Sequence, residues 1–368
     1  MDYSPAHPQV PCHCRRQLRN SHGILSAGAT STADPINGCI NAAPANSARR
    51  PWLAALLGGV IPGLGHLYLG RAGLAILFAV ATPSPLFIAT VAGAYRPIVL
   101  FPLILIGVAL HIAIWIATVA SAVLLARQKK TSYALTRYNH VASYVGFALA
   151  TWVASNAFAD FVGSSILDSF RIPSGAMLPT LVPGDQVLAT KVGVAERCQR
   201  GDVVVFTNPL LADVDLIQRI IGLPGDRIRI ENARIYLNGV EQPKRLIDPL
   251  YVVHLGFGDE IETEAGQLSE ETLGARPYRI LERASACGRP QNPVCTFDRG
   301  REFVVPPGHV FMMGDNRGNS ADSRFGFGVP GKSLEFVSFG NIKGRVAVIW
   351  LSFSLLDGIR WNRIGQTL

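Results

Sequence analysis

Residues 169–181, SFRIPSGAMLPTL, stand where the chain changes its character. Before this stretch, between residues 51 and 161, apolar residues dominate and charged residues are few. After it come short runs rich in β-branched residues, separated by Gly, Pro, Asn and Asp. Long apolar runs predict membrane helices, and short bounded runs predict strands. The sequence therefore predicts a membrane-anchored protein with a helical region over residues 51–165, followed by an all-β domain over residues 166–368.

The composition excludes an ordinary soluble protein. Of the 368 residues, 49% are hydrophobic and only 16% are charged, and the mean hydropathy is +0.26. The net charge of +8 has two interpretations. Nucleic-acid binding needs a basic patch on a soluble fold, whereas a membrane protein carries Lys and Arg beside its spans on the cytoplasmic side. The apolar region favours the second, so the lipid bilayer is the expected partner and nucleic acid is not.

Three apolar runs are long enough to span a bilayer, at about residues 72–94, 98–126 and 141–161. Pro83 and Pro85 should kink the first run. Residues 52–69 are shorter and contain five Gly and Pro residues, so this segment is predicted to be re-entrant or short. His111 lies inside the second long run, where it would serve either in a proton relay or in a structural hydrogen bond.

The charges beside the spans predict the orientation of the chain. Arg127, Lys129 and Lys130 form the strongest positive cluster next to a span, so this end is predicted to be cytoplasmic. The last apolar run leads away from it and places residues 166–368 outside the cytoplasm. Residues 1–50, rich in Ala, Asn, Ser, Pro and Arg, are predicted to be a disordered cytoplasmic tail. If residues 52–69 span the membrane, this tail lies outside instead.

The strand predictions rest on alternation of apolar and polar residues in short runs bounded by turn residues. The runs are QVLATKV, DVVVFTN, RIRIENARIYLNG, EFVVPPGHVFMMG and GRVAVIWLSF. Asn238-Gly239 is a hairpin-turn signal. Residues 252–286 are polar and poorly periodic, which indicates an insertion or a loop-rich subdomain beside the β core.

Five motifs occur in order after the last apolar run. They are RIPSGAMLPTLVPGD at 171–185, RGDVVVF at 200–206, IQRIIGLPGDRI at 217–228, FMMGDNRGNSADSRFGFGVP at 311–330 and IKGRVAVIW at 342–350. Together they resemble bacterial signal peptidase I over roughly residues 140–368. The resemblance implies an all-β catalytic domain near the membrane surface. Together with the apolar runs it predicts a multi-pass protein of a bacterial inner membrane with a periplasmic C-terminal domain. It also implies serine endopeptidase action on signal peptides of exported preproteins, with no cofactor and no metal.

The resemblance assigns two positions to the chemistry, and both carry other residues here. The family's nucleophile segment reads roughly P-S-G-S-M-x-P-T-L, and Ala176 stands at its attacking Ser. The family's general base is a Lys, and Gln218 stands at that position. A Ser nucleophile needs a base to remove its proton, and Gln cannot titrate. Ser174 resembles the family's oxyanion-hole donor and is the candidate substitute nucleophile.

Other site residues follow from the same resemblance. Ser320, Asp322 and Arg324 correspond to the shell that supports the base. Asp315 and Arg317 are expected to form structural charge pairs. The peptide would add as an extra strand along two backbone edges. The residues of these edges are Pro173, Gly175, Met177, Asp215 and Ile217. The family usually has Asp where this chain has Gly318.

Cys287 and Cys295 bracket the short loop CGRPQNPVC, which suits a local disulfide in an oxidising compartment. The alternative is a zinc site, which would need two further ligands nearby. Two functions remain open from the sequence. The chain cleaves leader peptides, with Ser174 as the attacking group, or it is a pseudoenzyme that binds signal peptides or assists secretion or assembly of exported proteins.

Overall fold

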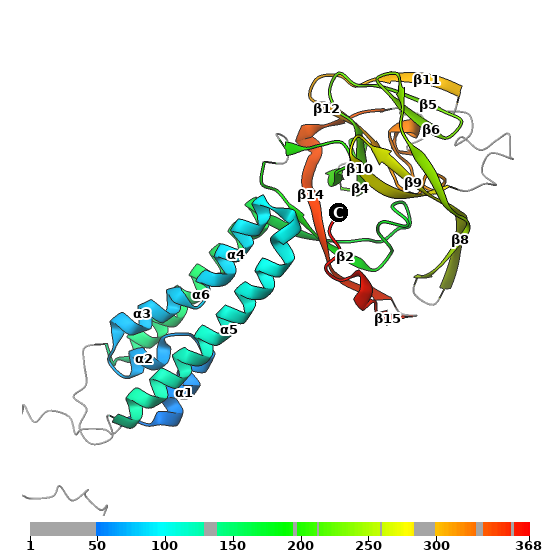
Figure 1. Cartoon of the computed structure of the whole chain (residues 1–368). Helices are drawn as coiled ribbons and strands as arrows, with labels where there is room; N and C mark the ends of the chain where they lie inside the picture. Colours follow the sequence, from blue (N-terminus) through cyan, green and yellow to red (C-terminus); the bar gives the residue numbers. More distant parts are fainter. Residues whose placement is uncertain are drawn as a thin grey trace, which may run out of the picture. The chain divides into compact units, whose positions relative to one another are not determined.

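The computed structural model describes residues 49–128, 138–193, 197–211, 213–257, 260–282, 299–328, 334–354 and 357–368. Residues 1–48 of the predicted tail and the Cys287–Cys295 pair lie outside these residues. An N-terminal group of helices is followed by a largely β region (Figure 1).

The described helices begin at Pro51. They are α1 (Pro51–Val60), α2 (Leu64–Tyr68), α3 (Ala72–Ala81), α4 (Ser84–Tyr95), α5 (Pro97–Gln128) and α6 (Val141–Ser165). Within the described residues, three helical segments are long and apolar enough to cross a membrane: Ala72–Tyr95, Pro97–Gln128 and Val141–Ser165. The first of them combines α3 and α4, and its helical path is interrupted between Ala81 and Ser84. The interruption falls at Thr82 and Pro83, which keep right-handed helical backbone angles, and Pro83 has no N–H to continue the hydrogen-bond ladder. The kink itself stays a prediction.

Two details fix the packing of the helices. Gly63 joins α1 and α2 with φ +91°, and a Cβ there would lie 2.1 Å from the carbonyl oxygen of Ala75, so only Gly fits. His111 Nδ1 lies 2.8 Å from the carbonyl oxygen of Thr82 at the break between α3 and α4. The described contact of His111 is therefore the structural hydrogen bond, one of its two predicted roles.

The main sheet of the β region has eight strands in the order β1-β2-β14-β3-β4-β12-β13, with β15 paired to β14. Its strands are β1 (Leu167–Arg171), β2 (Asp185–Thr190), β3 (Val203–Thr207), β4 (Asp215–Gly222), β12 (His309–Met313), β13 (Val337–Ser338), β14 (Ile342–Ser354) and β15 (Gly358–Ile359). All its pairings are antiparallel. Consecutive residues Val203, Val204 and Val205 are all buried, because both faces of this sheet are covered.

A second sheet, ordered β11-β5-β6-β7, contains the predicted hairpin turn. Its strands are β5 (Arg227–Glu231), β6 (Arg234–Leu237), β7 (Val240–Glu241) and β11 (Arg299–Val304). Asn238 and Gly239 join β6 to β7 with φ of 53° and 82°, the positive values that a two-residue hairpin turn requires. The turn prediction is confirmed.

The third sheet corrects a prediction. For residues 252–286 it contradicts the loop-rich alternative, because the described residues there belong to the long strands β8 (Lys244–Phe257), β9 (Glu260–Leu273) and β10 (Arg276–Glu282). That this stretch is an insertion stays a prediction. Two physical features prevented prediction of these strands from the alternation of apolar and polar residues. The pairing of β8 with β9 changes register around Asp248, which breaks the alternation. In addition, β9 buries the polar residues Glu264, Ser269 and Glu271, so the inward face does not look apolar.

Candidate functional site

The nucleophile segment follows β1, and Asn316, from the loop after β12, holds it through both its backbone and its side chain. Asn316 donates its backbone N–H to the carbonyl of Ala176 at 3.0 Å and its side-chain amide to the carbonyl of Gly175 at 3.0 Å. Met177 is buried in the core, whereas Pro173 and Ser174 are exposed. The backbone of this segment is thus fixed, while the two residues ahead of Gly175 face solvent.

Gln218 lies in β4, opposite Val204 of β3, with a side chain that is only 2% exposed. Its Nε2 donates to the carbonyl of Ala321 at 2.8 Å, and its Oε1 has no partner among the described residues. The amide is therefore anchored beside Ser320. It offers hydrogen bonds there but no group that can take up a proton at neutral pH.

Ser320 and Ala176 meet at Gly314, the residue after β12. A Cβ built on Gly314 would lie 2.2 Å from Ser320 Oγ and 2.6 Å from the carbonyl oxygen of Ala176. Only a residue without a side chain lets these two groups approach so closely. The structure thus brings together the positions of Ala176, Gln218 and Ser320 that the sequence predicted as one site.

Three buried polar atoms in this small region have no partner within the described part of the chain: Gln218 Oε1, Asn316 Oδ1 and Ser320 Oγ. Buried polar atoms are normally hydrogen-bonded, and exceptions concentrate at sites where another group or water binds. Two of the three are pure acceptors. The region is therefore built to receive a hydrogen-bond donor, and neither the methyl group of Ala176 nor the amide of Gln218 can act as a nucleophile or a base at neutral pH.

The supporting pair Asp322 and Arg324 is in place. Arg324 contacts both carboxylate oxygens of Asp322 at 2.8 Å, and Asp322 also accepts the backbone N–H of Gly314 at 3.0 Å. Arg324 donates further to the carbonyl of Arg317 at 3.1 Å. These contacts hold the loop that carries Ser320 against the end of β12.

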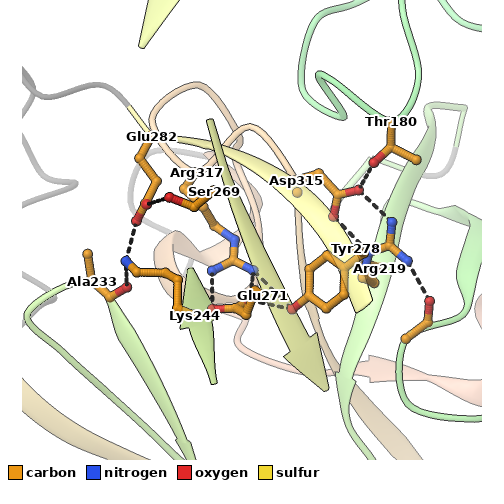
Figure 2. Close-up of polar contacts among 12 residues, drawn as sticks. Thr180, Arg219, Ala233, Lys244, Ser269, Glu271, Tyr278, Glu282, Asp315 and Arg317 are labelled. Carbon is orange, nitrogen blue, oxygen red and sulfur yellow. Dashed lines mark hydrogen bonds and ion pairs between the residues drawn. The ribbon is translucent and has the colours of Figure 1, made fainter. Parts of the chain in front are cut away.

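Asp315 and Arg317 each form a buried charge pair, as expected, but with partners that sequence reasoning missed. Figure 2 shows the carboxylate of Asp315 in contact with both Arg219 and Thr180. Arg219 Nε and Nη2 lie 2.8 and 2.6 Å from the two carboxylate oxygens of Asp315. Because Thr180 belongs to the nucleophile segment and Arg219 follows Gln218, this pair joins the two halves of the site.

Arg317 pairs with Glu271 of β9, which also accepts the hydroxyl of Tyr278 from β10 (Figure 2). Burial alone would raise the pKa of Glu271, but the charge of Arg317 and hydrogen bonds from Arg317 and Tyr278 outweigh it and lower that pKa. The same burial, together with the charge of Glu271, raises the pKa of Tyr278 well above its ordinary value. The third sheet is thereby fastened to the site loop.

The two predicted peptide-binding edges differ in their surroundings. At the first edge, the carbonyls of Gly175 and Ala176 are bonded to Asn316, and the second edge is part of β4. On β4, residues 215–219 pair with β3, but the opposite neighbour β12 pairs only from Arg219 onward. Residues 215–218 therefore have one side of their backbone unpaired among the described strands. The carboxylate of Asp215 accepts a hydrogen bond from Lys343 Nζ at 2.8 Å, and Ile217 packs on the core. An unpaired strand edge beside a site is the geometry that accepts an extended peptide.

Lys191, the nearest alternative base by sequence, is engaged elsewhere. Its Nζ lies 2.5 Å from the carbonyl of Gly163 in α6 and 3.1 Å from Asp168. Ser174 has no hydrogen bond to a titratable group within the described residues. The described part of the chain thus places no base in hydrogen-bond contact with Ser174.

Comparisons with known proteins identify the family. The family described as "Signal peptidase, peptidase S26" matches residues 145–351, more than half of the chain. Signal peptidase I of Pseudomonas aeruginosa is 33% identical over 207 residues, which cover 52% of this chain and 66% of that protein. Signal peptidase I of Buchnera aphidicola subsp. Acyrthosiphon pisum is 31% identical over 247 residues, covering 56% of this chain and 76% of that protein. The crystal structure of a signal peptidase I from Enterococcus faecalis, 20% identical and covering 41% of this chain and 97% of that one, has a TM-score of 0.21, too low to carry an argument. The sequence matches suffice, and the chain belongs to the signal peptidase family, peptidase S26.

Proposed function

We propose that this protein captures signal peptides of exported preproteins at the membrane without cleaving them by the family's Ser–Lys chemistry. One observation carries the proposal: Ala176 and Gln218 occupy the two positions where the family has its nucleophile and its base. A methyl group cannot attack a carbonyl carbon, and a Gln amide cannot remove a proton at neutral pH.

The groups needed for binding support capture. Asn316 fixes the backbone of Gly175 and Ala176, and among the described strands residues 215–218 have one unpaired backbone edge. Strand addition uses main-chain hydrogen bonds and shallow side-chain pockets, so it requires neither nucleophile nor base. A site that kept its shell and lost its two chemical groups is suited to recognition.

Cleavage through Ser174 is the weaker candidate. Ser174 lies in a bend two residues before position 176, and its side chain is exposed to solvent, so it does not take the place of residue 176. The exposed Ser174 also lacks a neighbouring base among the described residues, and Lys191 is bound to Gly163 and Asp168.

The proposed location is a bacterial inner membrane, with several spans and residues 166–368 on the periplasmic side. Arg127 lies in the last turn of α5, at the end predicted to be cytoplasmic. From there α6 would lead the chain across the membrane to the β region. In this orientation the peptide-binding edges face the compartment into which signal sequences emerge.

Capture is tested with the full chain in lipid nanodiscs and a fluorescent preprotein whose signal peptide ends in an A-x-A sequence. We expect saturable binding, measured by anisotropy, with no release of leader peptide on a gel. A matched preprotein with Phe at both small positions is the control and should bind at least tenfold more weakly. Equal binding of the two preproteins, or release of the leader peptide, would refute the proposal.

A further inference from the structure

Residues 358–368 contact the nucleophile segment, although nearly 180 positions separate the two in the sequence. Their backbone is fixed to β14 by two hydrogen bonds, of 2.8 and 3.0 Å, beyond the pairing of β15. Arg363 lies in this stretch, and 14% of its side chain is exposed. Its guanidinium donates to the carbonyl of Thr180 and to the carboxylate of Asp185. An Arg distant in sequence thereby reaches the segment that carries Ala176.

Asp185, at the start of β2, is the buried counter-charge of this Arg. Its side chain has no exposure, and Arg363 Nε and Nη2 lie 3.0 and 2.6 Å from its two oxygens. The same carboxylate accepts the hydroxyl of Ser352 at 2.6 Å and the backbone N–H of Val182 at 2.9 Å. Arg360 stands further away, at 3.6 Å. A buried carboxylate needs such a partner, so Arg363 stabilises the group that holds the Val182 amide.

The peptide unit between Thr180 and Leu181 is held at both ends. Its carbonyl accepts Arg363 Nη2 at 2.9 Å, and its N–H donates to the carbonyl of Met177 at 3.0 Å. The hydroxyl of Thr180 is bound separately, by Asp315. Met177 directly follows the position of the family's nucleophile. The orientation of this peptide unit therefore sets the turn that presents the site backbone.

We propose that Arg363 is a positioning residue for peptide capture, because it holds the Thr180 carbonyl and Asp185 in one arrangement and so sets the backbone beside which a signal peptide pairs. The inference rests on the proposed capture of signal peptides. Hydrogen bonds from a guanidinium are stronger than those between neutral groups, and its planar fork fixes their directions. Strand addition depends on main-chain geometry, so a shift of this backbone weakens it.

The positioning is tested first without preprotein, by amide hydrogen exchange of the full chain in lipid nanodiscs. Arg363→Met removes the guanidinium, and the amides of Leu181 and Val182 should then exchange about tenfold faster. Arg363→Lys places an ammonium in the same region and should restore part of the protection. Arg200→Met is the matched control, because it breaks a two-bond pair with buried Asp226 elsewhere in the β region, and both amides should stay within about twofold of the natural rates.

Capture is then measured on the same variants with the fluorescent preprotein. Arg363→Met should bind it about tenfold more weakly than the natural protein, Arg363→Lys should be intermediate, and Arg200→Met should bind as the natural protein does. If Arg363→Met does not fold, Asp185→Asn with Arg363→Met replaces it. That double variant has no unpaired buried carboxylate, whereas the Thr180 carbonyl still loses its donor.

Three results would overturn the proposal. One is unchanged exchange at Leu181 when the guanidinium is removed. Another is equal acceleration in Arg200→Met, which would indicate a loss of overall stability alone. The third is faster exchange with unchanged preprotein binding, which would show that capture does not depend on this backbone. A natural protein that binds no preprotein would refute capture itself, whereas the exchange rates would still decide whether Arg363 fixes the segment.

Discussion

The Arg219–Asp315 pair allows the sharpest prediction about stability. Their side chains are only 6% and 1% exposed, and two short hydrogen bonds join them. Arg219 also donates to the carbonyl of Gly201 at 2.6 Å, and Asp315 accepts the hydroxyl of Thr180. Asp315→Asn keeps the volume but leaves the guanidinium buried without its counter-charge. Breaking one side of a buried pair costs about 3–5 kcal/mol.

That cost converts to a shift in melting temperature. For a domain of 150–250 residues, about 1 kcal/mol corresponds to roughly 2–4 °C, so Asp315→Asn should lower Tm by about 6–20 °C. The assay is thermal unfolding of the full chain in detergent, followed by circular dichroism in the β-sheet region. The control is Arg245→Met, which removes one partner of the exposed Arg245–Glu270 pair and should cost less than about 1 kcal/mol.

A double variant separates the buried charge from general disruption. Arg219→Met with Asp315→Leu replaces both partners by apolar groups, which is often neutral or stabilising. We expect it to recover at least half of the Tm lost in Asp315→Asn. The reasoning is refuted if Asp315→Asn costs no more than Arg245→Met, or if the double variant is as unstable as the single one.

Three further predictions concern the β region. Burial would raise the pKa of Glu271, but the charge of Arg317 lowers it, so Glu271 contributes stability that is complete above about pH 4.5 and is lost as pH falls through the folded pKa. The difference in Tm between the natural protein and Glu271→Gln should therefore be constant from pH 6 to 8 and smaller at pH 3. An equal difference at pH 3 would contradict this. Burial raises the pKa of the Cys198 thiol to about 12 from 9.0, so alkylation of Cys198 at pH 8, mapped by mass spectrometry, should be roughly 10³-fold slower in the folded than in the unfolded chain. Gly184 has φ +90°, and a Cβ there would lie 2.1 Å from a carbonyl oxygen of β14. Gly308 has φ +74°, but a Cβ there would meet no atom within 4 Å, so Gly184→Ala should lower Tm more than Gly308→Ala. Similar losses of Tm would show that the contact with β14 is unimportant.

Local sequence signals predicted much of the fold because their causes are local. Asn238 and Gly239 adopt positive φ at low cost, so the hairpin could be placed without knowing its surroundings. Pro83 stands at the interruption between α3 and α4, because a Pro has no N–H for the helical hydrogen-bond ladder. The motifs around Ala176, Gln218 and Ser320 likewise predicted one site, and the chain folds so that these positions lie together.

What sequence reasoning missed depends on contacts between distant residues. Glu271 lies 46 residues before Arg317, in a stretch whose buried polar side chains resemble a loop pattern. Only the folded chain shows that a carboxylate on β9 faces inward to meet an Arg. Asn316 gave no signal either, because a polar residue after a buried strand usually indicates a turn. Its role in holding two carbonyls of the nucleophile segment emerges from the close approach at Gly314.

The most direct test measures leader-peptide release from a preprotein by purified full-length variants in nanodiscs. The variants are the natural protein, Ser174→Ala, Ala176→Ser with Gln218→Lys, and Ala176→Ser with Gln218→Met as the control that cannot titrate. We expect release only from the Ser–Lys variant, with activity rising with pH because a Lys base must be neutral. Robust release by the natural protein, lost in Ser174→Ala, would contradict the claim that this site recognises signal peptides without cleaving them.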